Sequence, residues 1–118
     1  MRLTDEYKEQ QKELHESNKN YGTSSFIYKS HILGVIDFFK PKNVLDYGCG
    51  KGLSKQFIDT PLTLYDPCIK GLDSDPDSAD LVICTDVLEH IEPECLDDVL
   101  DHLQKLTNLA GFFLSARS

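Results

Sequence analysis

The sequence lacks most features that mark a membrane, metal-binding or nucleic-acid-binding protein. No apolar run is long enough to span a membrane or resembles a secretory signal. The four cysteines form no CxxC pair and the histidines have no metal-ligand spacing, so we expect reduced thiols and no metal. Lys and Arg number only 12 against 20 acidic residues, and a net charge of -8 disfavours a nucleic-acid partner. These absences predict a soluble, cytoplasmic protein.

What is present suits one small domain, because 118 residues bury a single modest core. Residues 1–20 are polar on nearly every face and are expected to form a surface helix or a loose arm. Apolar spacing over residues 24–39 predicts a buried helix that ends near Pro41. The remaining expected elements are strands at 43–47, 62–65, 81–84 and 112–115, a brief helix at 53–58, and an amphipathic helix at 93–107 that Gly111 separates from the last strand.

Strands that alternate with helices predict right-handed crossovers and a parallel sheet with helices on both faces. The expected fold class is therefore α/β, a small three-layer sandwich with about four strands. In such sheets, ligands bind beyond the carboxyl ends of the strands. The glycine-rich loop that follows the first strand lies at that edge.

This loop belongs to the stretch VLDYGCGKG, residues 44–52, and its spacing separates three kinds of nucleotide site. A phosphate-binding P-loop needs Ser or Thr after its GK pair, but Lys51 is followed by Gly52. A dinucleotide fingerprint needs GxGxxG, whereas the sixth position here is Leu53. What remains is an acid, Asp46, two residues before a GxGxG run.

That pattern resembles the first motif of the class I S-adenosylmethionine-dependent methyltransferases, and two further segments extend the resemblance. Asp66 ends the second expected strand 20 residues after Asp46, where the family has a carboxylate. The segment SADLVICTDVLEHIEP, residues 78–93, resembles the family's fourth strand and the helix after it. A narrower resemblance, through YGTSS at residues 21–25, is to small stand-alone methyltransferases of tailed-phage genomes.

The resemblance implies a Rossmann-like domain over residues 21–118 that binds S-adenosylmethionine and releases S-adenosylhomocysteine. It places Asp46 near the ammonium of the methionine moiety and Asp66 at the ribose hydroxyls. The implied cofactor-binding residues are Tyr21, Asp46, Tyr47, Gly48, Cys49, Gly50, Asp66, Pro67, Cys84, Thr85 and Asp86.

Two residues are candidates for acid–base chemistry. Asp86 could hold an ammonium or take a substrate proton, although an aspartate there is also an ordinary helix N-cap. His90 could act as a general base, although it equally suits a half-buried histidine that ends a helical turn.

The sequence departs from the family in two places. Only 12 residues, 68–79, separate Pro67 from Asp80, too few for the family's third strand and its helix. The chain also ends just after the fifth strand of the family's seven. We therefore expect a truncated domain with strands in the spatial order second, first, fourth, fifth, and a homodimer formed through the exposed last strand.

The implied reaction is methyl transfer by direct in-line displacement to an unidentified acceptor, with a small molecule favoured. One alternative is an incomplete module that binds S-adenosylmethionine, S-adenosylhomocysteine or a partner without turnover. A second is an enzyme that degrades S-adenosylmethionine. Nothing in the sequence identifies the individual acceptor.

Overall fold

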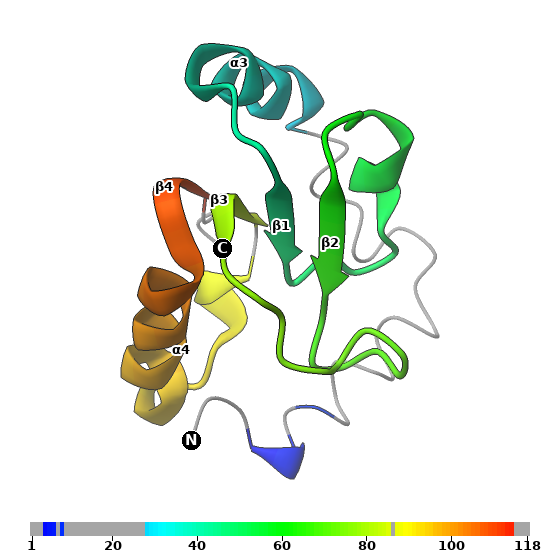
Figure 1. The fold of residues 1–118 in the computed structure, drawn as a ribbon. Coiled ribbons are helices and arrows are strands. Elements are labelled where there is room, and N and C mark those ends of the chain that lie inside the picture. Colours follow the sequence, from blue (N-terminus) through cyan, green and yellow to red (C-terminus); the bar gives the residue numbers. More distant parts are fainter. Residues whose placement is uncertain (1–3, 7, 9–27, 86, 115–118) are drawn as a thin grey trace.

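A computed structural model describes residues 4–6, 8, 28–85 and 87–114, which form a parallel sheet with helices on both faces (Figure 1). The predicted N-terminal arm and the start of the first predicted helix therefore lie largely outside the described residues. The elements are α3 Lys29–Phe39, β1 Val44–Tyr47, η1 Leu53–Gln56, β2 Leu62–Tyr65, β3 Ala79–Thr85, η2 Leu88–His90, α4 Pro93–Leu106 and β4 Thr107–Leu114, where η marks a 3-10 helix. None of the described helices is long and apolar enough to cross a membrane.

The four strands run parallel in the order β2-β1-β3-β4. This order is the one predicted from the sequence, because β3 and β4 correspond to the strands numbered fourth and fifth there. It places β1 between β2 and β3. Asp46 on β1 has Leu64 of β2 on one side and Ile83 of β3 on the other. The carboxyl ends of these three strands consequently lie along one edge.

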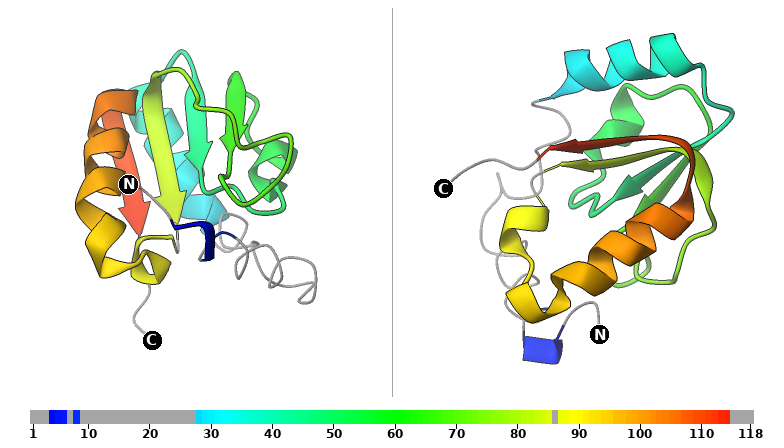
Figure 2. Two further views of the ribbon diagram at one scale, coloured as in Figure 1. Left: turned by 90° about the horizontal axis from the view of Figure 1, so that it is seen from below. Right: turned by 90° about the vertical axis from the view of Figure 1, so that its left-hand side faces the viewer.

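Two apolar cores hold the layers together, one on each face of the sheet. Figure 2 (right) shows α3 on one side of the strands and α4 on the other. The core under α4 consists of Leu45, Tyr47, Tyr65, Ala79, Val82, Cys84, Val99, Leu103 and Leu106. The core under α3 consists of Ile32, Val44, Ile58, Leu81 and Ile83. The fold is a Rossmann-like three-layer α/β sandwich.

The two long helices end where the sequence gives a physical reason. Helix α3 ends at Phe39 because the backbone of Lys40 adopts a left-handed conformation and its N–H donates to the carbonyl of Ile36. The next residue, Pro41, could not continue the helix. Helix α4 begins with Pro93, which lacks the N–H that the first turn leaves unpaired. Both agree with the prediction to within about one residue at these ends.

The last strand was predicted wrongly. Strand β4 begins at Thr107, directly after α4, and not at Phe112. Gly111 does not separate the helix from the strand but pairs with Val82 inside the sheet. The ring of Phe113 lies over this glycine, 2.7 Å from where a Cβ atom would stand. Pairing along the seven residues of β3 thus outweighs the local tendency of glycine to break a strand.

The segment between β2 and β3 contains turns and no helix or strand, as the shortage of residues predicted. It folds back on itself, since the backbone N–H of Asp66 donates to the carbonyl of Leu72 at 2.9 Å. The family's third strand therefore has no counterpart in this sheet.

Candidate functional site

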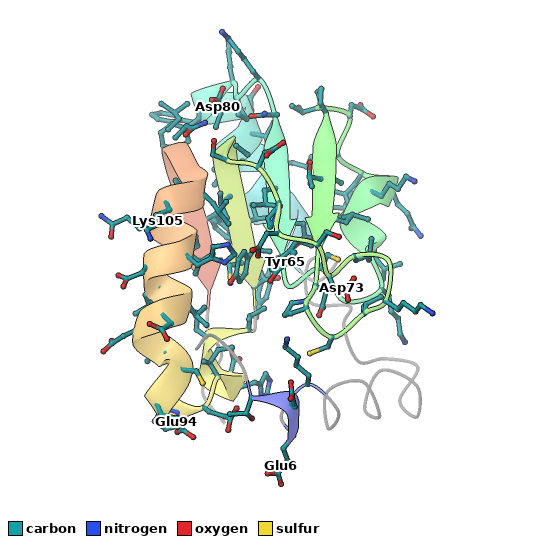
Figure 3. All side chains as sticks on the ribbon, turned by 60° about the horizontal axis from the view of Figure 1, so that its bottom comes forward. Glu6, Tyr65, Asp73, Asp80, Glu94 and Lys105 are labelled. Carbon is teal, nitrogen blue, oxygen red and sulfur yellow. The ribbon has the colours of Figure 1, made fainter. Side chains whose placement is uncertain are left out.

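The predicted site residues that the structure describes gather at the carboxyl edge of the sheet. Figure 3 shows Asp80, at the amino end of β3, at one end of the sheet, with Tyr65 and Asp73 toward the other. The described part of the N-terminal arm lies at this second end as well, where Glu6 is labelled. There Thr4 donates its backbone N–H to Oε1 of Glu92 at 3.2 Å.

The loop after β1 is tied to the end of β2 by backbone hydrogen bonds. The N–H groups of Gly48 and Cys49 both donate to the carbonyl of Tyr65, at 2.7 and 3.0 Å. Gly48, Gly50 and Gly52 have φ values of 80°, 56° and 71°, in the left-handed region that glycine tolerates best. The alternate glycines therefore serve the turn from strand to 3-10 helix.

Gly48 has a second reason to lack a side chain, and it is a neighbouring residue. A Cβ atom there would stand 2.4 Å from Cγ2 of Val87. The space that a side chain at Gly48 would need is thus occupied by the protein itself. Val87 was not among the predicted site residues, and no sequence signal singles it out.

Asp46 is the most unusual group at this edge, because a carboxylate only 1% exposed stands at the middle of the sheet. The hydroxyl of Ser54 donates to its Oδ2 at 2.5 Å, and no other described residue donates a hydrogen bond to it. Burial raises the pKa of Asp46 from 3.8 to about 6; the Ser54 hydrogen bond opposes this rise and the charge of Asp66 adds to it. Asp46 is therefore a buried anion at neutral pH, and its Oδ1 accepts no hydrogen bond from any residue that the structure describes.

Asp66 is also buried, but both of its oxygens bind backbone N–H groups. Oδ2 accepts from Gly50 at 3.0 Å and Oδ1 accepts from Cys68 at 2.9 Å. The side chain therefore holds the glycine loop against the turn that follows β2. Each carboxylate oxygen can accept a second hydrogen bond in addition to these.

The cysteines of the site are thiols and do not supply a nucleophile at neutral pH. No disulfide joins the four cysteines. Burial, together with the charges of Asp46 and Asp66, raises the pKa of Cys49 far above its usual range. Burial likewise raises the pKa of Cys84, and that of Cys68 rises to about 12. Cys84 and Thr85 are both buried at the end of β3.

The other predicted site residues are less uniform. Tyr21 and Asp86 lie outside the described residues. Tyr47 packs into the core under α4, where its hydroxyl meets Nδ1 of His102 at 2.8 Å. Pro67 is half-buried beside Asp66, and His90 is exposed at the end of η2.

The sequence alone missed two hydroxyl contacts that shape this edge. Ser54 lies eight residues beyond Asp46, and His102 lies 55 residues beyond Tyr47, so neither pair follows from local spacing. His102 also approaches Oδ1 of Asp75 to 3.8 Å. Within the described part of the chain, no group of three or more His, Cys, Asp or Glu side chains could hold a metal ion.

The chain was compared with known protein families, curated proteins and solved structures. A family model described as a methyltransferase domain matches residues 25–116. The structure of the 16S rRNA methylase RmtB is similar at a TM-score of 0.44 and 19% identity, over 91% of this chain and 59% of that one. The chain thus spans less than two thirds of that methylase. No curated protein matches the chain.

Proposed function

Because this chain belongs to the class I S-adenosylmethionine-dependent methyltransferase family, we propose that it transfers a methyl group from S-adenosylmethionine to a small-molecule acceptor. S-Adenosylhomocysteine is then the second product. We place the cofactor-binding unit in residues 21–118 and treat residues 1–20 as an arm. The observation that supports the proposal best is the buried carboxylate of Asp46.

A buried carboxylate is costly unless a positive or hydrogen-bonding partner compensates it. Asp46 has one hydroxyl donor among the described residues and the negative charge of Asp66 nearby. Its remaining oxygen suits an ammonium group, which carries three donors and a positive charge. The methionine moiety of the proposed cofactor has such an ammonium.

The neighbouring groups suit the rest of the same ligand. Asp66 lies at the end of β2 with second acceptor positions on both oxygens, which would accept hydrogen bonds from two ribose hydroxyls. The backbone from Gly48 to Gly50 would pass beneath the amino-acid moiety. Cys84 and Thr85 would border the methionine end, with Tyr21, Pro67 and Asp86 completing the proposed set.

The bound cofactor would supply an activated methyl group for in-line displacement by the acceptor's nucleophile, with the sulfonium sulfur as the leaving group. The chain contributes position and exclusion of water, which can provide most of the rate. We assign proton removal from the acceptor, where the acceptor needs it, to His90 or Asp86.

A titration of the purified protein with S-adenosylmethionine and S-adenosylhomocysteine tests this proposal. Wild type is expected to bind both, and Asp46→Ala and Asp66→Ala to bind neither. Asp73→Ala is the matched control, because Asp73 is an exposed carboxylate of the loop after β2. If wild type binds neither ligand, the proposal is wrong.

A second experiment separates transfer from binding alone. Product formation is measured against amines, hydroxyl compounds, nucleobases, peptides and ribosomal RNA as acceptors. Transfer to a small molecule supports the proposal, whereas transfer to RNA alone would overturn its acceptor class. Binding without any product would favour a module that holds the cofactor without turnover, and S-adenosylmethionine loss without methylated product would favour its degradation.

A further inference from the structure

Ser54 is a buried hydroxyl to which the proposed reaction assigns no role. Its side chain is 0% exposed, and its Oγ donates to Oδ2 of Asp46 at 2.5 Å. A polar group buried this completely costs stability unless it is hydrogen-bonded. The bond that compensates Ser54 is therefore also a bond to the carboxylate on which ligand binding is proposed to depend.

The backbone holds Ser54 in place from both sides. Before it, Gly52 turns the chain in the left-handed region, and a Cβ atom there would stand 3.0 Å from Cδ1 of Leu64 on β2. After it, the N–H groups of Phe57 and Ile58 donate to the Ser54 carbonyl at 3.1 and 3.0 Å. Ile58 belongs to the core under α3. The backbone of Ser54 is thus held by contacts that do not involve the carboxylate.

We propose that Ser54 is a positioning residue that fixes one oxygen of Asp46, leaves the other for the ligand's ammonium, and thereby sets the acid limit of ligand binding. This inference rests on the proposed function, since it assigns the control of the same site. Protonation of Asp46 removes the charge that attracts the ammonium. The hydroxyl opposes protonation because it donates to the ionised carboxylate.

The other titratable groups around Asp46 act against its ionisation or stay neutral. Asp66, at the end of β2, adds a negative charge that raises the pKa of Asp46, after burial as the main cause. Burial and the charge of Asp46 raise the pKa values of Cys49 in the glycine loop and Cys84 on β3 well above neutral pH, so both thiols stay uncharged. Ser54 is consequently the group among these described neighbours that favours the charged carboxylate.

The expected result for wild type is an acid limit near pH 6, below which affinity falls about tenfold per pH unit. A hydrogen bond to a charged group is worth enough to shift a pKa by about 1–2 units. Ser54→Ala is therefore expected to move the limit upward by about 1–2 pH units. Binding would be roughly tenfold weaker near pH 6.5 and would approach wild type near pH 8.5.

Dissociation constants of S-adenosylhomocysteine are measured by calorimetry for both proteins at each pH. Their ratio cancels the titration of the ligand's own amino group. Ser54→Thr keeps the hydroxyl and is expected to retain the wild-type limit. Val99→Ala, a truncation in the core under α4, controls for loss of stability and is expected to leave the limit unchanged. A ratio that is constant across pH for Ser54→Ala would overturn the proposal.

A readout without ligand separates this inference from the proposed function. The carboxyl carbon of Asp46 is titrated by NMR in ligand-free wild type and Ser54→Ala, with Asp46→Asn used to assign its signal. A midpoint that rises in Ser54→Ala supports the positioning role, and an unchanged midpoint overturns it. Failure of wild type to bind ligand at any pH would instead refute the proposed function.

Discussion

Asp46→Asn is expected to change the pH dependence of folding in a way that can be calculated. Burial raises the pKa of Asp46 from 3.8 to about 6. Between pH 3.8 and pH 6, the folded protein therefore still holds the Asp46 proton, whereas the unfolded chain has already lost it. The contribution of Asp46 to stability is therefore most favourable below pH 3.8, falls as the pH rises toward 6, and stays constant above. A shift of this size corresponds to about 3 kcal/mol.

Asparagine has nearly the same shape and no charge, and its carbonyl can accept the Ser54 hydrogen bond. Any cost of its buried amide is the same at every pH. The free energy of unfolding of the variant minus that of wild type should therefore increase by about 2.4 kcal/mol between about pH 4 and pH 7.5, because at pH 4 part of the unfolded chain still holds the proton. The other carboxyl groups contribute equally to both proteins and cancel.

Urea unfolding followed by far-ultraviolet circular dichroism measures this difference, since the chain contains no tryptophan. The two pH values lie on either side of the isoelectric point near 4.8, where solubility is lowest. Asp73→Asn, an exposed substitution, should give a nearly constant difference. A constant or decreasing difference for Asp46→Asn would show that the folded protein does not penalise the Asp46 charge.

Two further predictions concern packing and assembly. Gly48→Ala should lower the free energy of unfolding by about 1–3 kcal/mol more than Gly71→Ala, because both glycines have positive φ but only a Cβ atom at position 48 would press against Val87. In the Gly48→Ala background, Val87→Ala should restore part of this stability. Equal losses of stability for the two glycine variants in urea unfolding would contradict this prediction. Strand β4, at one end of the sheet, has no charged residue or proline and leaves Leu109 55% and Phe113 43% exposed. The protein should therefore dimerise through β4, and Leu109→Lys should favour monomers. A wild-type monomer by light scattering at high concentration would contradict this prediction.

The sequence predicted the sheet well because its signals are periodic and its connections are short. The apolar spacing of α4 gave that helix to within one residue, and the strand order β2-β1-β3-β4 is the predicted one. The predicted start of β4 was wrong because glycine usually interrupts a strand, whereas Gly111 here pairs with Val82 of β3. No local sequence pattern reveals such pairing. Tertiary pairing decided that boundary.

The site was predictable in its outline and not in its internal contacts. Asp46 and Asp66 were proposed from the sequence because each lies near the end of an expected strand, and the structure places both at the same edge of the sheet. Their hydrogen-bond partners depend on how a tight loop folds back over eight to sixteen residues. The assignment of cofactor contacts to these residues stays a prediction, which the titrations above test.

The packing of Val87 against Gly48 has a consequence for how such a motif changes in evolution. A glycine retained only for a ligand could drift once that ligand was no longer used. This glycine would be retained in either case, because a larger residue would collide with Val87 and adopt a strained backbone. A descendant of this chain that did not bind the proposed cofactor should therefore keep the glycine, whereas Asp46, whose buried charge lowers the stability of the fold, should be the first motif residue to be replaced.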